Sequence, residues 1–175
     1  MFARSLAAYD GVVRDAIRAL KFHGRRDVAA PLGRLLAGFA AHALSEPIDA
    51  VVAVPLHPAR LAARGFNQAA LLADPVARVM RARPLADALR RVRQDAPQVT
   101  LGAGARRANV AGVFTPGRES VRGVVLLVDD VFSTGATAAA CAETLVAMGA
   151  ARVVILTLAR AILTRNPPEI VRAGR

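Results

Sequence analysis

Residues 125–137, which read VLLVDDVFSTGAT, decide the fold class of this 175-residue chain. Five apolar residues, 124–128, end abruptly at Asp129 and Asp130. A continuous β-branched run of this kind is typical of a strand that is buried on both faces of a sheet. A loop of small residues follows the acidic pair, and an Ala-rich stretch then predicts a helix over residues 137–148, which ends at Gly149.

A second apolar run, residues 153–158, follows this helix and predicts another buried strand. Strand, loop, helix and strand within about 35 residues form a βαβ unit. Such units build parallel sheets through right-handed crossovers. We therefore predict an α/β protein with a Rossmann-like parallel sheet flanked by helices.

The rest of the chain fits this scheme. Helical periodicity predicts helices over residues 12–22, 31–44 and 68–80, and the core face of the second contains Leu32, Leu35, Leu36 and Phe39. Residues 50–54 predict a buried strand, and residues 83–85 a short strand or turn. Gly and Pro interrupt residues 93–117, which we expect to be an irregular functional flap. We expect one domain over residues 1–165 and a loosely held tail over 166–175.

Composition narrows the class of protein. The formal charge is +11, from 24 Lys and Arg residues against 13 Asp and Glu, and the only lysine is Lys21. This excess favours polyanionic partners, or reflects the compositional bias of a genome. Every apolar run is too short to span a membrane, and the start of the chain lacks a signal peptide. The single cysteine, Cys141, cannot form an internal disulfide, so we expect a cytoplasmic protein.

The acidic pair and the loop after it predict the ligand. In an open parallel sheet, ligands bind beyond the carboxyl ends of the strands, which is where Asp129 and Asp130 lie. Carboxylates accept hydrogen bonds from sugar hydroxyls or approach a Mg²⁺-bound ligand. A loop of small residues at a helix N-terminus binds a phosphate group. A diol close to a phosphate is the pattern of a ribose 5-phosphate.

Other proteins place similar residues at a strand end. A P-loop is excluded, because GxxxxGK[ST] is absent. A phosphorelay receiver would need a further Asp and a Lys downstream, and neither follows Asp130. The remaining alternative is an ordinary turn, with two solvated Asp residues and a Ser or Thr that caps the helix.

Residues 125–137 resemble the signature of the type I phosphoribosyltransferases: a hydrophobic strand, two acidic residues and a small-residue phosphate loop. The resemblance implies their fold, with a flexible hood and flap over the active site. It also implies that Asp129 and Asp130 hold the ribose hydroxyls of 5-phosphoribosyl 1-diphosphate (PRPP). The residues implied to bind its 5-phosphate are Ser133, Thr134, Gly135, Ala136 and Thr137.

The same family has an earlier loop that binds the diphosphate, and residues 54–57 occupy the matching place. Leu56, His57, Arg60 and Arg64 are the residues that we assign to it, since arginine suits bidentate contacts to phosphate. Arg106 and Arg107 would bring positive charge to the departing diphosphate from the flap. Solvated polar and basic loops are the alternative for each of these groups.

Longer stretches resemble the ComF family of competence-associated proteins, which is akin to the phosphoribosyltransferase part of amidophosphoribosyltransferases. They are YDGVVRDAIRALKFHG, VPLHPARLAARGFNQAALLA and LRRVRQDAPQVTLGAGARRANVAGVF, and the resemblance covers residues 9–158. Many relatives begin with a Cys-rich zinc ribbon, which Cys141 alone cannot form. Either this member lost that module or the chain starts after it. The resemblance also implies that the chain can form a homodimer.

The leading hypothesis is transfer of phosphoribose from PRPP to a nitrogenous acceptor. Substrate-bound Mg²⁺ and basic groups would neutralise the diphosphate, and Asp129 and Asp130 would act by positioning and electrostatics. The rival hypothesis is a non-catalytic module that acts in DNA uptake, with single-stranded DNA or competence proteins as partners. A hydrolase that uses water as acceptor is a third. We interpret Lys21 as a chance survival among arginines, and Asn67 and Gln68 as a cap or anchor of the following helix.

Overall fold

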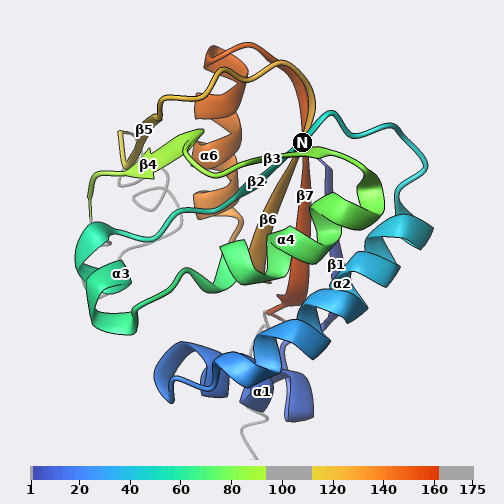
Figure 1. Ribbon diagram of the computed structural model, residues 1–175, viewed down its shortest axis with the longest axis vertical. Helices are drawn as coiled ribbons and strands as arrows, with labels where there is room; N and C mark the ends of the chain where they lie inside the picture. Colours follow the sequence, from blue (N-terminus) through green and yellow to red (C-terminus); the bar gives the residue numbers. More distant parts are fainter. Residues whose placement is uncertain (1, 94–111, 162–175) are drawn as a thin grey trace, which may run out of the picture.

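The fold is organised around a five-stranded parallel sheet with strand order β1-β7-β6-β2-β3 (Figure 1). The computed structural model describes residues 2–93 and 112–161. Every neighbouring pair in this sheet is parallel, so the predicted α/β class is confirmed. The strands are β1 Phe2–Ala8, β2 Ala50–Ala53, β3 Arg83–Leu85, β6 Gly123–Phe132 and β7 Ala150–Arg160.

Helices cover both faces of the sheet. Figure 1 shows α2 and α4 crossing one face, with α6 on the other. Next to α6 lies a two-stranded antiparallel ribbon made of β4 and β5. The remaining elements are α1 Gly11–Phe22, η1 Arg26–Val28, α2 Ala29–Ala43, α3 Pro58–Arg64, α4 Gln68–Met80, β4 Leu89–Arg91, β5 Phe114–Pro116 and α6 Ala136–Ala147.

Strand β6 divides the hydrophobic core into two layers. Its side chains alternate between the faces of the sheet, as they do in any strand. Val125 and Leu127 pack in the layer that contains Leu145 of α6. Leu126 and Val128 pack in the layer formed by α1, α2 and α4. Because both faces are covered, β6 reads as a continuous apolar run rather than as an alternating one.

Two crossovers leave the centre of the sheet in opposite directions. The chain passes from β2 through α4 to β3, which lies on one side, and from β6 through α6 to β7, which lies on the other. Crossovers of one hand that run in opposite directions put their helices on opposite faces. The strand order therefore switches between β6 and β2, and a crevice opens at the carboxyl ends of these two strands.

Most predicted elements are confirmed. The helix over residues 68–80 is α4, and the Asn67 side chain caps it by accepting a hydrogen bond from the Ala69 N–H at 3.0 Å. Asn67 Nδ2 also donates to the Val54 carbonyl at 3.0 Å, which ties the start of α4 to the end of β2. This side chain therefore couples a helix on one face of the sheet to the rim of the crevice.

Several expectations were wrong. The strand predicted to end at residue 128 continues through Phe132, because β7 pairs with it as far as Arg160. Leu35, expected in the core, is 61% exposed, whereas Leu36 is fully buried. Strands β1, β4 and β5 and helix α3 were not predicted, and β5 replaces part of the expected irregular stretch.

Some expectations fall outside the described residues, namely Arg106 and Arg107, most of the flap and the tail over residues 166–175. None of the helices in the described part of the chain is long and apolar enough to cross a membrane.

Candidate functional site

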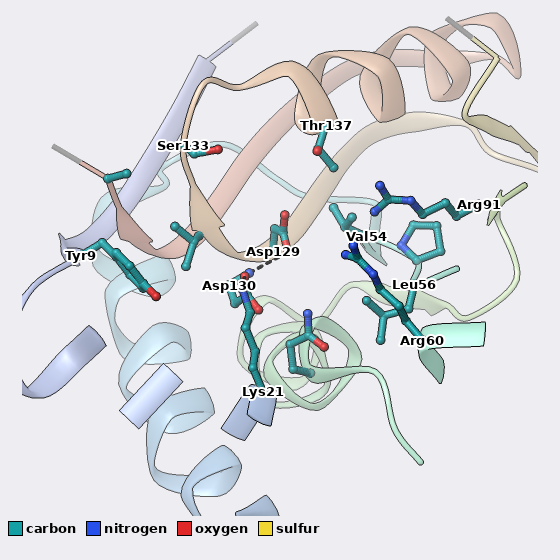
Figure 2. Close-up of a pocket in the computed structure, with 14 residues that line it drawn as sticks. Tyr9, Lys21, Val54, Leu56, Arg60, Arg91, Asp129, Asp130, Ser133 and Thr137 are labelled. Carbon is teal, nitrogen blue, oxygen red and sulfur yellow. Dashed lines mark hydrogen bonds and ion pairs between the residues drawn. The ribbon is translucent and has the colours of Figure 1, made fainter. Parts of the chain in front are cut away.

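A cavity of about 330 Å³ lies at the switch between β6 and β2 (Figure 2). The ends of both strands contribute to it, as do the start of α6 and side chains from α1, α3 and α4. The lining residues are Tyr9, Lys21, Val54, Pro55, Leu56, Arg60, Gln68, Arg91, Asp129, Asp130, Val131, Ser133, Thr137 and Ala161.

Asp129 and Asp130 lie near the end of strand β6 rather than in the loop beyond it. As neighbours in a strand, they point to opposite faces of the sheet. In Figure 2, Asp130 points toward Lys21, whereas Asp129 lies on the side of Thr137. The carboxylate of Asp129 accepts a hydrogen bond from the Asp130 N–H at 2.8 Å, which fixes its orientation.

Asp130 is a buried carboxylate, and only one of its two oxygens has a partner among the described residues. Its residue surface is only 3% exposed. Lys21 Nζ of α1 lies 2.7 Å from Asp130 Oδ1 and compensates its charge. Oδ2 has no hydrogen-bond partner among the described residues. Leaving a buried acceptor without a partner costs about 1–3 kcal/mol. Because Asp130 is also one of the residues that line the cavity, a donor from a ligand is a candidate partner for this oxygen.

The environment of Asp129 favours its protonated form. Burial raises the pKa of this carboxyl group, and the neighbouring Asp130 carboxylate raises it further, to about 7. The hydrogen bond from the Asp130 N–H and the charges of Lys21 and Arg91 act in the opposite direction. On the same face of the sheet, burial and the charge of Asp129 raise the pKa of the buried Cys141 thiol. Cys141 is thus a buried core residue of α6.

The loop over residues 133–137 joins β6 to α6 in a tight turn. Gly135 adopts a left-handed φ of +79°, and a Cβ at this position would lie 2.7 Å from the Phe132 ring. Gly135 is the N-cap of α6 and has no side chain to cap it, whereas Thr134 Oγ1 accepts a hydrogen bond from the Ala136 N–H at 3.4 Å. Ser133 and Thr137 line the cavity, and the exposed N-terminal N–H groups of a helix attract anions.

Only part of the predicted diphosphate segment lines the cavity. Leu56 and Arg60 do so. His57 instead caps α3, where its Nδ1 accepts a hydrogen bond from the Ala59 N–H at 3.3 Å. Arg64 donates to Oε1 of Gln68 and lies with its guanidinium 5.9 Å from the centre of the Phe22 ring. Burial lowers the pKa of Arg64, and the charge of Asp130 partly restores it.

The chain has curated relatives over most of its length, although no protein-family model matches it. DNA utilization protein YhgH of Escherichia coli K12 is 36% identical over 168 residues, which cover 90% of this chain and 71% of the relative. The protein of the same name from Salmonella typhi is 35% identical over 163 residues, with the same coverage. Competence protein F of Haemophilus influenzae is 34% identical over 123 residues, which cover 69% of this chain and 53% of that protein.

The chain belongs to the ComF family. Its fold is the one that the resemblance to type I phosphoribosyltransferases implies: an α/β protein with a parallel sheet flanked by helices. The names of these ComF-family relatives refer to competence and to the use of DNA, and they do not mention a sugar phosphate.

Four polar or charged residues that line the cavity of this ComF-family chain were missed or set aside in the sequence: Tyr9, Lys21, Gln68 and Arg91. Gln68 was interpreted as an anchor of α4, and it does begin that helix, yet it also faces the cavity. The sequence does distinguish Lys21 from the other basic residues, because it is the only lysine beside 23 arginines. Nothing in the sequence indicated Tyr9 or Arg91, since Tyr9 directly follows β1 and Arg91 ends β4, two strands that were not predicted.

Within residues 2–93 and 112–161, no three His, Cys, Asp or Glu side chains gather into a group that could hold a metal ion. Asp129 and Asp130 point to opposite faces of the sheet, and Lys21 already neutralises one of them. Among the described residues, no ion pair is recorded for Asp129.

Proposed function

We propose that this chain binds PRPP in the cavity between β6 and β2 and transfers its phosphoribosyl group to a nitrogenous acceptor. The observation that carries the proposal is the buried Oδ2 of Asp130, which has no partner among the described residues and belongs to a residue that lines the same cavity as Ser133 and Thr137. The first feature suits a sugar hydroxyl and the second suits a phosphate. A pentose phosphate carries both groups on one molecule.

The groups of PRPP would follow the walls of the cavity. The 5-phosphate would lie against Ser133 and Thr137 at the N-terminus of α6, and the ribose hydroxyls against the acidic pair. The diphosphate would lie toward Leu56 and Arg60, since an arginine offers several N–H donors to phosphate oxygens. A Mg²⁺ ion bound to the diphosphate would neutralise part of its charge.

In the transfer step, the bond between C1 of the ribose and the diphosphate oxygen breaks, and its electron pair leaves with the diphosphate. A bond between C1 and the acceptor nitrogen forms from the opposite side, and the proton lost by the nitrogen passes to the departing diphosphate. Positive charge develops on the sugar ring, next to the acidic pair. No nucleophile from the protein takes part, so Asp129 and Asp130 act by positioning and electrostatics.

Calorimetric titration tests the binding part of this proposal. PRPP with Mg²⁺ is titrated into the wild type and into the double variant Asp129→Asn/Asp130→Asn, with circular dichroism to verify that both are folded. We expect binding by the wild type and none by the variant. Absence of binding by the wild type at low salt would overturn the proposal.

Release of diphosphate tests turnover. PRPP is incubated with candidate nitrogenous acceptors, and both diphosphate and the ribosylated product are measured. Diphosphate that appears with free ribose 5-phosphate, and does not depend on any acceptor, would identify a hydrolase instead.

A second candidate function is a non-catalytic module that binds single-stranded DNA. The formal charge of +11 and the names of the relatives favour it. Fluorescence anisotropy of a labelled oligonucleotide at increasing salt measures this binding, because phosphate contacts make affinity fall steeply with salt. Affinity that is unchanged in Asp129→Asn/Asp130→Asn, together with no binding of PRPP, would favour the module over the transferase.

A further inference from the structure

The only lysine of the chain lies in the candidate site. Ile17 and Leu20 anchor α1 in the core, and Lys21 follows them with its side chain directed at the cavity (Figure 2). Arg14 and Arg18 of the same helix are exposed. A chain that uses arginine at 23 of its 24 Lys and Arg positions thus has a lysine where the cation contacts a buried carboxylate.

The geometry of this ion pair explains why the cation is a lysine. An arginine has a planar fork of donors that binds both oxygens of a carboxylate at once. An ammonium group is a compact charge, and Lys21 Nζ contacts Oδ1 of Asp130 at 2.7 Å and leaves Oδ2 vacant. A lysine therefore neutralises Asp130 without occupying the oxygen that a ligand would use.

The ion pair of Lys21 and Asp130 offers a ligand a hydrogen-bond donor beside an acceptor. An ammonium group has three N–H donors, and within the described residues Asp130 is the partner recorded for Lys21. Lys21 also lines the cavity, so its remaining donors are available to a ligand there. The vacant Oδ2 of Asp130 supplies the acceptor. Two neighbouring hydroxyl groups match this arrangement, because one can donate to Oδ2 while the next accepts from Nζ.

We propose that Lys21 is a specificity-determining residue, which together with Asp130 recognises the two neighbouring hydroxyl groups of a pentose phosphate. This proposal rests on the proposed function, and it adds that the pocket selects ribose over deoxyribose compounds. It also assigns to α1, an element far from the β6 motif in sequence, a direct part in ligand selection.

The test compares three sugar phosphates with three proteins. Ribose 5-phosphate and its 2-deoxy and 3-deoxy analogues are titrated calorimetrically into the wild type, Lys21→Arg and Arg18→Lys. Lys21→Arg keeps the charge and the ion pair, so it is expected to fold. Arg18→Lys makes the reverse exchange at an exposed position of the same helix and controls for general effects of the swap.

We expect the wild type to bind ribose 5-phosphate about tenfold to a hundredfold more tightly than at least one deoxy analogue, as for a hydrogen bond to a charged group. In Lys21→Arg, the affinity for ribose 5-phosphate falls about tenfold and this preference shrinks to below about threefold, because the guanidinium occupies Oδ2. Arg18→Lys behaves as the wild type does.

The outcomes separate the two proposals. If the wild type binds ribose 5-phosphate and Lys21→Arg keeps the same affinity and preference, the proposal for Lys21 is wrong and the proposed function stands. If the wild type binds PRPP but none of the three compounds, the proposal for Lys21 is wrong and the proposed function stands; if it binds neither PRPP nor these compounds, both are wrong.

A measurement on the wild type does not depend on the variant. Labelling with [¹⁵N]lysine gives a single side-chain ammonium signal, since the chain has one lysine. Ribose 5-phosphate should shift this signal more than the deoxy analogues do, and equal shifts would contradict the role of Lys21.

Discussion

Two segments border the cavity, and each brings only part of its assigned residues to it, for different structural reasons. In the segment at the end of β6, residues 129–137, Asp129, Asp130, Ser133 and Thr137 line the cavity. Thr134, Gly135 and Ala136, which were assigned to the same site, are not among the lining residues. In the segment after β2, residues 54–64, Leu56 and Arg60 do so, whereas His57 caps a helix and Arg64 binds Gln68. The acidic pair of the first segment lies in an extended strand, whose alternation fixes the direction of each side chain. The second contains the short helix α3, which spreads its side chains around an axis.

The largest expected effect on ligand affinity lies in the segment at the end of β6, and it distinguishes Asp130 from Asp129. We expect Asp130→Asn to weaken the binding of ribose 5-phosphate about a hundredfold, because the amide breaks the pair with Lys21 and removes the charged acceptor. Asp129→Asn should cost about tenfold, since Asp129 has no direct ion pair in the cavity. Calorimetry measures both affinities. Equal losses would show that the two residues act as one unit.

The pH dependence of stability distinguishes the same two carboxylates. The pKa of Asp129 is raised to about 7 in the folded state, against about 3.9 in an unfolded chain. Between these values the folded state binds more protons than the unfolded state, so stability falls as pH rises from about 4 to about 7. We expect Asp129 to contribute a fall of about 2 kcal/mol, less than full burial would give, because its side chain is partly open to the cavity.

Urea unfolding of the wild type and of Asp129→Asn across this pH range measures that contribution. The difference in unfolding free energy between them should change with pH in the stated direction. A difference that stays constant from pH 4 to pH 7 would contradict the raised pKa.

The turn after the acidic pair gives the next effect. Gly135→Ala should destabilise the fold by about 1–2 kcal/mol, because alanine disfavours a φ of +79° and its Cβ would meet the Phe132 ring. Gly38→Ala is the matched control: Gly38 lies within α2, and nothing lies within 4 Å of a Cβ there. That change should stabilise the fold by about 0.5–1 kcal/mol. Thermal unfolding compares the two, and a similar effect of both would show that the turn is not constrained.

The smallest expected effect lies in the segment after β2. Arg60→Met should weaken PRPP binding about tenfold and leave the binding of ribose 5-phosphate unchanged, since Arg60 faces the expected diphosphate position. Arg64→Met removes the same charge from the same helix but from a side chain that does not line the cavity, and should cost less than about threefold. If the two variants lose equal affinity for PRPP, the contribution of α3 is long-range electrostatics alone.

The fold was predictable wherever a segment carried its own periodicity. Strands β6 and β7 and helices α4 and α6 bury long apolar stretches, and these patterns do not depend on distant residues. Strand β1 was not predicted, because its residues, FARSLAA, form neither a long apolar run nor a clear alternation, and they acquire a partner only through β7. The end of β6 was placed too early for a related reason: Asp129 looks like the end of a strand, but pairing with Thr157 keeps it within the sheet.

The candidate site was predictable where chemistry and local geometry coincide in sequence. The acidic pair, the loop and the glycine lie within a few residues of one another, so one motif describes them. Lys21 reaches Asp130 across more than a hundred residues of sequence, and only the packing of α1 against the sheet brings the two together. Arg91 reaches the cavity from β4, whose three residues show no periodicity.

The position of β1 also bears on how the chain folds during synthesis. Its pairing with β7 joins Phe2–Ala8 to Ala150–Arg160, and the hydroxyls of Ser5 and Thr157 meet at 2.7 Å across 152 residues of sequence. The ribosome releases the first strand long before its only neighbour in the sheet exists. The wall of the cavity that carries Tyr9 therefore forms last, and a nascent chain leaves the edge of β1 open to other strands until β7 has emerged.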